Sequence, residues 1–516
     1  MSRHRHTSAA AFLFAGMSLM LLSCLQNGPS EAELSDFGRY VYALDTLQLE
    51  QTTKQLLATD TTSYGSVSTL SSSSSAVRNR YAEAPAEALW FTRLGLSSDA
   101  DSMLVILRRE LPRHGLDSST FFLPAIADDL HVVRALAFDS LGLNINDVLM
   151  RLDYHLSQAF VRYVAGQRYG FTRPNKLLNR HDTKPDGSYV RLFDFDIKAP
   201  DYDEVIQALT SETRIDYLQA SAPCSPIYQA LQMKLDSTSN AQERRTIAVN
   251  LERCRWQGAQ PESQGRRILV NIPAQHLWAI SADSVLDMRI CCGATATKTP
   301  LLHSEITHIE VNPAWIIPQT IIKAEVSAHA GDTAYFSRHR YTIINRSTGA
   351  ALNPASVTVA QLQSGNLRVS QQPGAGNSLG RIIFRFPNDF SVFLHDTSTR
   401  SAFQRDRRTL SHGCVRVQKP FELAAFILPD ADEWTLERLR LSMDLAPTTD
   451  RGRTYLDEHA DDPRPLRLIN RHDVKPHVPV DITYFTAYPN PATGIVELWP
   501  DLYGFDELLA PSIPLQ

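Results

Sequence analysis

The sequence has few of the features that mark several common classes of protein. Its 516 residues include only six cysteines, far too few for a disulfide scaffold. Lys and Arg number 51 against 56 Asp and Glu, a net charge of -5, so the chain has no excess of cationic side chains of the kind that nucleic-acid binding needs. The 16 histidines are scattered without the spacing of metal ligands. We therefore expect no nucleic-acid partner, no metal and no cofactor.

The N-terminal apolar run, Ala9 to Leu22, is too short for a comfortable transmembrane span. It follows Arg3 and Arg5, which is typical of a signal peptide over residues 1–23. The run ends in Leu21-Leu22-Ser23-Cys24, which resembles the bacterial lipobox, where the cysteine is diacylated and becomes the new N-terminus. We expect a periplasmic protein held to a membrane by lipid on Cys24, with the outer membrane preferred. The alternative is an ordinary secretory signal with an incidental cysteine.

Export would place the other cysteines in a compartment where a disulfide can persist. Cys291 and Cys292 are adjacent and poorly placed to bridge each other. Cys224 and Cys254 could each find a partner or remain buried thiols. The sequence leaves this open.

A chain of this length with 43% hydrophobic residues predicts two or three domains. Residues 24–85 are polar and low in complexity, with a serine run at 71–75, and we interpret them as a lipidated N-terminus and tether; a poorly packed extension is the alternative. Residues 86–256 predict a helical scaffold domain. Its helices are expected from Ser98 to about Leu111, and from caps at Asn146 and Asp147 through Tyr163.

After Trp256 the pattern changes to short β-rich runs broken by turn residues. The runs are Arg267–Ile272, Thr307–Val311, Tyr341–Ile344, Leu367–Val369, Arg381–Phe386 and Ser391–His395. They predict a mostly antiparallel β domain over residues 257–516, with a possible lid insertion at 326–364 and a short helix from Pro420. A turn at Pro387-Asn388-Asp389 would place His395 at the end of a hairpin strand. The fold class is therefore α+β.

The chemistry-bearing segment is Ser411-His412-Gly413-Cys414-Val415-Arg416-Val417. Gly413 lets backbone approach closely, and N–H groups at Gly413 and Cys414 could face an oxyanion formed on a carbonyl attacked by the Cys414 sulfur. His395 lies upstream in Phe393-Leu394-His395-Asp396-Thr397. A neutral imidazole there could take the thiol proton, a pairing that makes a cysteine nucleophilic below its usual pKa. A buried packing pair is the plain alternative.

Ser411 to Arg416 together with His395-Asp396-Thr397 resembles the signature of the L,D-transpeptidases, the YkuD-fold cysteine enzymes that crosslink peptidoglycan. The resemblance extends to the large, helical-scaffold (YcbB-like) branch over roughly Ala86 to Leu509. The further segments that carry it are Asn250–Arg253, Val270–Pro273, Ser304–Thr307, Val311–Pro313, Pro373–Arg381, Phe386–Asn388 and Tyr484–Ala487. Members of this branch often carry a peptidoglycan-binding helical module before Asn250, and Ser225–Ser239 is too short and too polar for a complete one.

The resemblance implies that Cys414 is the nucleophile and His395 the general base. It also implies an oxyanion hole formed by the backbone at His412, Gly413 and Cys414. Ser411, Phe393 and Arg416 are expected to belong to the same oxyanion and substrate-binding group of residues. His412 is either a proton carrier or a residue that shapes the loop. Arg416 could bind a stem-peptide carboxylate or form a structural ion pair. The arginines between Asp396 and Leu410 could frame an acidic peptide or form a solvated loop.

The expected reaction is ping-pong acyl transfer on peptidoglycan stem peptides. Cys414 attacks a tetrapeptide stem, releases the terminal D-alanine, forms a thioester and passes the acyl group to an amine of a second stem, giving a 3→3 crosslink. Alternatives on the same site are an L,D-carboxypeptidase and an enzyme that attaches a protein to the wall. An alternative from another class is a non-catalytic wall-binding lipoprotein.

Overall fold

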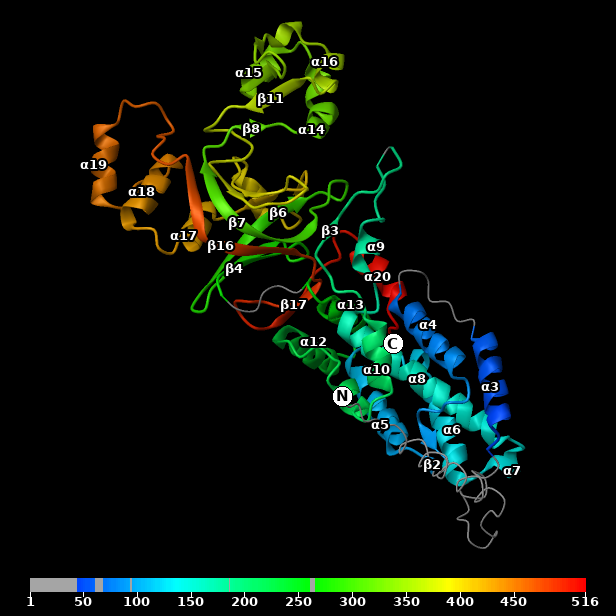
Figure 1. Cartoon of the computed structure of the whole chain (residues 1–516). Helices are drawn as coiled ribbons and strands as arrows, with labels where there is room; N and C mark the ends of the chain where they lie inside the picture. Colours follow the sequence, from blue (N-terminus) through cyan, green and yellow to red (C-terminus); the bar gives the residue numbers. More distant parts are fainter. Residues whose placement is uncertain (1–43, 61–67, 93–94, 185, 260–264) are drawn as a thin grey trace, which may run out of the picture. The chain divides into compact units, whose positions relative to one another are not determined.

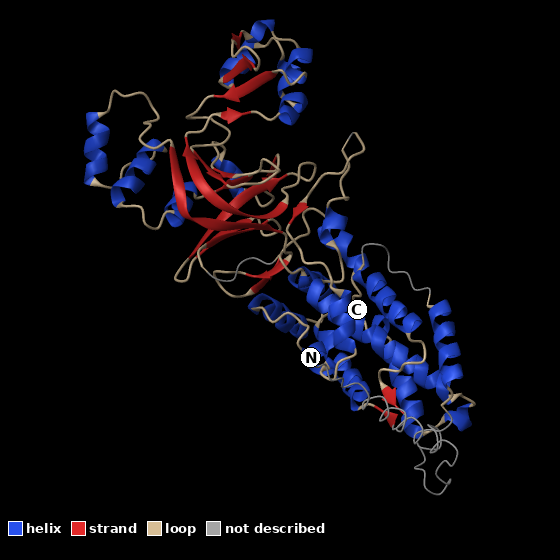
Figure 2. Ribbon diagram, viewed as in Figure 1, coloured by secondary structure: helices blue, strands red, loops and turns tan. Residues whose placement is uncertain are grey.

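The computed structural model describes residues 44–60, 68–92, 95–184, 186–259 and 265–516 (Figures 1 and 2). The chain forms two compact units. The first contains the described residues of Met1–Pro112, Asp117–Gly166 and Asp201–Ala222, and the second contains Arg113–Leu116, Gln167–Pro200 and Pro223–Gln516. The predicted signal peptide and Cys24 lie outside the described residues.

The first unit is helical, as predicted for the N-terminal scaffold. Its helices are α3 (Thr46–Thr59), α4 (Thr69–Glu83), α5 (Ser98–Arg113), η1 (Ser119–Phe121), α6 (Leu123–Ala135), α7 (Phe138–Leu141), α8 (Ile145–Tyr169), α10 (Tyr202–Leu209) and α11 (Arg214–Gln219). Two short strands, β1 (Phe91–Thr92) and β2 (Gly95–Leu96), pair with each other. The cap of α8 is Asn144, whose Oδ1 accepts from the Asn146 N–H at 2.8 Å, so the predicted caps Asn146 and Asp147 lie inside the first turn.

A tether was predicted for residues 24–85. The described part of this segment instead forms helices α3 and α4, and residues 24–43 and 61–67 lie outside the described residues. The serine run lies inside α4, where Ser73 and Ser74 are buried. Tyr81 of α4 donates a hydrogen bond to Asp153 of α8, and its hydroxyl lies 2.7 Å from Ser157 Oγ. Serine content indicated flexibility, but the apolar positions Leu70, Val77 and Tyr81 fall at helical spacing and are buried.

The second unit is built around a mixed sheet whose strands close into a ring of pairings. The order β12-β13-β15-β6-β5-β4-β16-β7 returns to its start because β12 also pairs with β7. The strands are β4 (Arg267–Asn271), β5 (His276–Ile280), β6 (Val285–Gly293), β7 (Leu301–Val311), β12 (Ile382–Arg385), β13 (Leu394–His395), β15 (Val415–Val417) and β16 (Arg471–Thr483), with β3 (Phe193–Asp194) beside β7 and β14 (Thr409–Ser411) beside β6. Most pairs are antiparallel, as expected, whereas β13–β15, β14–β6, β16–β4 and β3–β7 are parallel.

The predicted insertion is a small subdomain that begins earlier and ends later than residues 326–364. It lies between β7 and β12, which pair with each other through Val311 and Ile382. Its elements are β8 (Trp315–Ile316), α14 (Gln319–Ala324), η2 (Val326–His329), α15 (Thr333–Arg338), β9 (Tyr341–Asn345), β10 (Ala351–Leu352), η3 (Pro354–Ser356), α16 (Val359–Gln363) and β11 (Leu367–Gln371). This inserted subdomain, residues 315–371, has its own apolar core around Phe336 and Val369.

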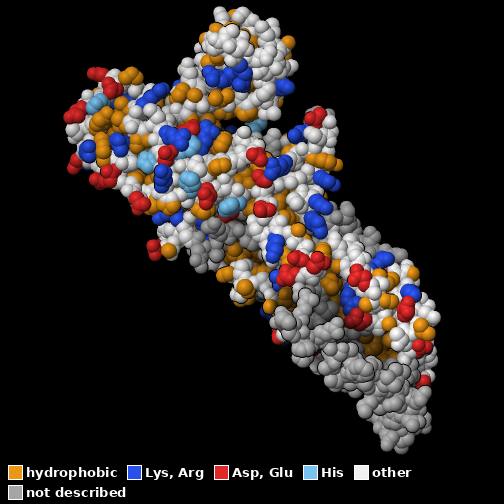
Figure 3. All heavy atoms as spheres, viewed as in Figure 1, with side chains coloured by type: hydrophobic (Ala, Val, Ile, Leu, Met, Phe, Trp, Pro, Cys, Tyr) orange, Lys and Arg blue, Asp and Glu red, His pale blue; other side chains and the backbone are white. Residues whose placement is uncertain are grey.

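The remaining elements of the second unit lie before, after and between these strands. They are α9 (Pro174–Leu178), α12 (Pro226–Ser237), α13 (Ala241–Arg255), η4 (Arg400–Gln404), α17 (Pro420–Ile427), α18 (Glu433–Ser442), α19 (Asp450–Glu458), β17 (Ala487–Pro489), β18 (Val496–Leu498), α20 (Phe505–Leu509) and η5 (Ala510–Ser512). Helix α17 begins at the predicted Pro420. On the face in Figure 3, cationic and anionic side chains are interspersed. No helix in the described ranges is long and apolar enough to cross a bilayer.

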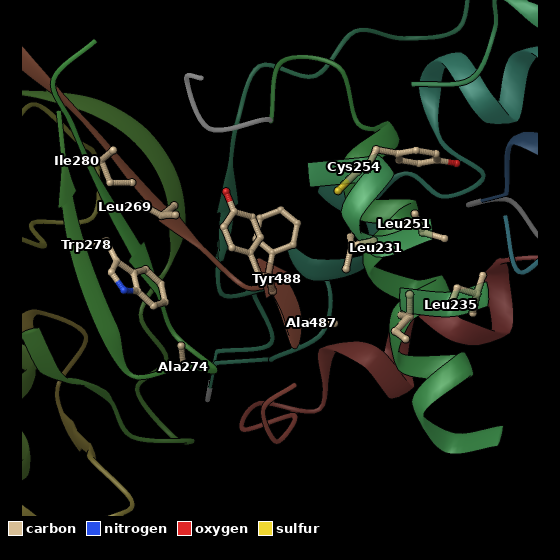
Figure 4. Packing of buried hydrophobic residues seen from close by; sticks show 13 residues of the cluster. Leu231, Leu235, Leu251, Cys254, Leu269, Ala274, Trp278, Ile280, Ala487 and Tyr488 are labelled. Atoms are coloured by element: carbon tan, nitrogen blue, oxygen red, sulfur yellow. The ribbon is translucent and has the colours of Figure 1, made fainter. Parts of the chain in front are cut away.

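The boundary predicted at residue 256 is also corrected. Helices α12 and α13 belong to the second unit because their apolar faces pack against the sheet. Leu231 and Leu251 of these helices share a core with Leu269 and Trp278 of the sheet and Tyr488 of β17 (Figure 4). Helix α12, which covers most of the suspected remnant of a wall-binding module, buries Tyr228, Leu231 and Leu235 here.

A buried ion pair joins α13 to its surroundings in the second unit. Arg255 and Glu252 are both fully buried, with Nη1 and Oε2 3.4 Å apart. The other Glu252 oxygen accepts from the Thr172 N–H at 2.8 Å and from Trp256 Nε1 at 3.1 Å. Arg255 donates to Gln167 Oε1 at 2.9 Å. Each charge therefore depends on the other, since neither reaches water.

Removing one of these charges should destabilise the second unit strongly. We expect Glu252→Gln to cost about 3–5 kcal/mol, because Arg255 would be left as an uncompensated buried charge. The matched control is Glu507→Gln, which breaks the exposed pair with Arg245 and should cost at most about 1 kcal/mol. Thermal and urea unfolding followed by circular dichroism measure both. Equal stability of the two variants would contradict the role of the buried pair.

Candidate active site

The loop that carries Cys414 runs from β14 to β15 and has a glycine where one is required. Gly413 has φ of +115°, a backbone conformation that residues with a Cβ rarely adopt. Thr297 Oγ1 donates to Ser411 O at 2.9 Å, and Thr299 Oγ1 donates to Gly413 O at 2.8 Å. Two threonine hydroxyls from the segment after β6 thus fix this loop, which holds Cys414 in place.

The Ser411 side chain closes the loop from inside. Its hydroxyl donates to Cys414 O at 2.5 Å and accepts from the Gly413 N–H at 3.1 Å. Ser411 is 3% exposed, so it supports the loop rather than facing substrate. Because the Gly413 N–H is already bonded, the expected oxyanion hole is corrected: the backbone N–H groups of His412 and Cys414 are the remaining candidate donors.

Strand pairing brings His395 next to the cysteine loop. In the parallel β13–β15 pair, Leu394 is level with Val415 and His395 is level with Arg416, and the Val415 N–H donates to Phe393 O at 3.0 Å. The same register carried back one residue places Phe393 beside Cys414. Since strand residues two apart share a face, Cys414 and His395 are diagonal neighbours on one face. The predicted pair is thus brought together, with His395 at the end of a hairpin strand as expected.

The hydrogen bond of His395 decides which ring nitrogen can act as a base. Nδ1 lies 2.5 Å from the Asp396 carbonyl oxygen. Because a carbonyl oxygen only accepts, Nδ1 carries the hydrogen, and Nε2 of the neutral ring keeps its lone pair. Burial lowers the pKa of His395 to about 4, and the charge of Arg416 acts in the same direction. The ring is therefore a neutral proton acceptor at neutral pH.

The thiol itself is less acidic than the sequence led us to expect. Burial raises the pKa of Cys414, although a backbone contact with Phe393 and the charges of Arg416 and Arg385 act in the opposite direction. Its Sγ lies 3.8 Å from the Ser391 carbonyl oxygen. The resting pair is thus a neutral thiol and a neutral imidazole, and the imidazole would remove the proton during attack on a carbonyl.

Asp396 and Gly380 support the histidine, and the sequence analysis gave them no role. Asp396 Oδ2 accepts from the Arg381 N–H at 2.9 Å, and Oδ1 accepts from Arg400 Nη1 at 2.9 Å. A Cβ on Gly380 would come within 2.4 Å of Asp396 Oδ2. In the sequence, only the position of Asp396 directly after His395 indicated that it could support the histidine. The groups that bond to its carboxylate come from separate segments of the chain, so no local pattern indicated them.

The four arginines between Asp396 and Leu410 divide by the contacts they make, and of the four Arg408 alone is buried. Arg400 pairs with Asp396, and Arg408 is buried, where it donates to Ile290 O at 3.0 Å and Gln275 O at 3.0 Å. These two hold the structure together, which corrects their expected role of framing an acidic peptide. Arg405 and Arg407 are exposed.

Arg416, Arg385 and Phe393 line the same region as the cysteine and histidine. Arg416 lies level with His395, and its buried Nε has no hydrogen-bond partner among the described residues. The guanidinium of Arg385 stacks 4.4 Å from the centre of the Phe393 ring and pairs with Glu310 at 3.0 Å. This combination of cationic and aromatic groups suits a peptide carrying carboxylates.

His412 is exposed and contacts the inserted subdomain. Its Nε2 lies 2.8 Å from Glu325 Oε1, a residue at the junction of α14 and η2. The sequence analysis missed Glu325, because only the fold of the inserted subdomain brings it to the cysteine loop. Among the described residues, Cys224 is exposed and has no disulfide partner, whereas Cys254, Cys291 and Cys292 are buried thiols.

The raised thiol pKa predicts how Cys414 reacts with alkylating agents. A raised pKa lowers the thiolate fraction at any given pH, so the rate with iodoacetamide should climb about tenfold per pH unit through neutrality and level off only above pH ~8.5, the ordinary thiol value. Peptide mapping by mass spectrometry separates Cys414 from the exposed Cys224, and Cys414→Ala gives the background. A plateau already reached between pH 5 and 7 would instead indicate a thiolate–imidazolium pair.

Comparison with known protein families agrees with this architecture. Residues 265–436 match the family model of the YkuD L,D-transpeptidase catalytic domain, and residues 75–235 match that of the Scaffold domain. The first match covers β4 to β15, and with them Cys414 and His395.

A curated relative from Haemophilus influenzae, provisionally named an L,D-transpeptidase, is 28% identical over 321 residues. The alignment covers 60% of this chain and 60% of the relative, so the chain spans somewhat less than two thirds of the relative's length. The chain therefore carries the catalytic domain of the L,D-transpeptidase (YkuD) family, preceded in sequence by a Scaffold domain.

Proposed function

We propose that the protein is a cysteine-dependent L,D-transpeptidase that forms 3→3 crosslinks in peptidoglycan. The observation that carries the proposal is the β13–β15 register, which sets Cys414 and His395 on one face, with the His395 ring held through Nδ1 by the Asp396 carbonyl. The family of the catalytic domain supplies the substrate class, peptidoglycan stem peptides.

In the first half-reaction, Cys414 Sγ attacks the carbonyl of the third residue of a tetrapeptide stem while His395 Nε2 takes the thiol proton. The developing oxyanion would accept from the His412 or Cys414 N–H. The bond to the terminal D-alanine then breaks, and its amine leaves with the proton from His395. The product is a thioester on Cys414.

In the second half-reaction, an amine of another stem attacks the thioester carbonyl. A C–N bond forms, the C–S bond breaks, and the proton lost by the amine ends on Cys414 Sγ. The neutral resting pair suits formation of the thioester, because an imidazole with a pKa of about 4 is unprotonated before Cys414 attacks. Its conjugate acid readily returns the proton to a leaving amine.

Intact-mass analysis with a purified disaccharide-tetrapeptide tests the proposal. We expect an adduct equal to the substrate minus D-alanine on the wild type and on Cys224→Ala, and none on Cys414→Ala. His395→Ala should form it about 10²–10⁴-fold more slowly. Chromatography of the products should show crosslinked dimers.

Two results would contradict the proposal in different ways. An adduct that persists in Cys414→Ala would place the nucleophile elsewhere. Trimmed tripeptide without dimer would make the protein a carboxypeptidase with the same acyl-enzyme.

We further propose that the mature protein is a periplasmic lipoprotein anchored through Cys24, with the outer membrane as its site. The support is the sequence Leu21-Leu22-Ser23-Cys24 after a short apolar run. Two or three acyl chains give stable attachment, because each buried CH2 contributes about 0.8 kcal/mol.

Substituting Cys24 should release the protein from the membrane. We expect wild type and Cys224→Ala to partition into detergent with an acylated N-terminal peptide, and Cys24→Ala to remain in the aqueous phase. Membrane fractionation and mass spectrometry of the N-terminal peptide measure this. An unmodified Cys24 in membrane-bound protein would contradict the anchor.

A further inference from the structure

A cavity of about 720 Å³ lies beside the cysteine loop, within the size range of small-molecule and peptide sites. His412 contributes to its wall, together with Thr295 and Thr297 of the segment after β6. Residues 181–183 form another part, and helix α14 closes it with Thr320 and Ala324. The wall is rich in hydroxyl and imidazole groups, which suits a polar peptide with many amide groups.

The cavity and His395 lie on different sides of the cysteine loop. Strand β13, which carries His395 and directly follows Phe393, borders the loop on one side through the β13–β15 pair. The segment that lines the cavity borders it on the other, where Thr297 Oγ1 donates to Ser411 O at 2.9 Å. A donor stem engaged with His395 therefore leaves the cavity open for a second stem.

The charged groups in and beside the cavity wall form pairs. Lys298 is nearly buried and pairs with Asp182 at 2.6 Å. Glu325, directly after the lining residue Ala324, lies with Oε1 2.8 Å from His412 Nε2. Because a carboxylate accepts only, Nε2 of His412 carries the hydrogen, and Nδ1 of the neutral ring is left with its lone pair.

We propose that this cavity is the acceptor subsite, which binds a peptidoglycan stem through its free amine, and that His412 is the base for that amine. The proposal rests on the proposed function. His412 Nδ1 takes a proton from the amine as its nitrogen bonds to the thioester carbonyl. The proton passes to Cys414 Sγ as the C–S bond breaks. Glu325 is a positioning residue that fixes the ring and its tautomer.

Each half-reaction then uses a different histidine as its base. His395 serves formation of the thioester, and His412 serves its transfer to the amine. The inserted subdomain supplies both Glu325 and one wall of the cavity, so crosslinking depends on it whereas acyl-enzyme formation does not.

The test separates the two half-reactions on the full-length protein. Acyl-enzyme formation from disaccharide-tetrapeptide is followed by intact mass in a single turnover. A disaccharide-tripeptide is then added as acceptor, and dimer formation is followed by chromatography. Ala324→Trp and Thr320→Trp should fill the cavity, and Lys323→Trp is the matched control, since Lys323 is exposed on the same helix and does not line the cavity.

We expect the two filling variants to form acyl-enzyme at the wild-type rate but to make dimer at least about tenfold more slowly, with Lys323→Trp unchanged. Glu325→Ala should also form acyl-enzyme at the wild-type rate but make dimer more slowly, even at saturating acceptor. Glu325→Asp should recover part of the rate of dimer formation, which a merely structural role would not produce. Circular dichroism checks folding.

Unchanged dimer formation in both filling variants would overturn the subsite, as would a parallel loss of acyl-enzyme formation. Wild-type protein that forms acyl-enzyme but only hydrolyses it would overturn the acceptor proposal alone. Failure of the wild type to form any acyl-enzyme would instead overturn the proposed function.

Discussion

The parallel pairing of β13 with β15 is the constraint on which the rest of the site depends. It fixes Leu394 level with Val415 and His395 level with Arg416. A shift of one residue would turn His395 to the opposite face, because side chains alternate along a strand. The closed ring of strands, with β12 paired to both β13 and β7, holds this register, since no edge near the site is left free to slip.

The cysteine loop is held as firmly as the strands, and by side-chain hydroxyls. Thr297, Thr299 and Ser411 occupy the carbonyl and N–H groups around Gly413. A loop fixed in this way would need little reorganisation on binding a substrate, which is how oriented dipoles become effective in catalysis. The same bonds remove the Gly413 N–H from the set of oxyanion donors.

Burial is the common cause of the unusual acidities at the site. It lowers the pKa of His395 and raises that of Cys414, so both are neutral at rest. The charge of Arg416 lowers both pKa values. On the thiol it therefore opposes the effect of burial, and on the imidazole it adds to the effect of burial. A thiol that is neutral at rest is less open to side reactions than a standing thiolate would be.

The sequence by itself determined the α+β class and the order of helical and β-rich parts, because local periodicity and turn residues encode them. It also located, to within one or two residues at each end, the strands that the structure has at 267–271, 341–345, 367–371 and 382–385. It also singled out Cys414 and His395, since glycine before a cysteine and a histidine at a strand end are local patterns. Tertiary packing of small apolar faces decided that the serine run lies in a helix, α4, and that α12 and α13 belong to the second unit. The pKa directions, the bonded Gly413 N–H and the Glu325–His412 contact depend on burial and on segments far apart in the chain, which no local pattern records.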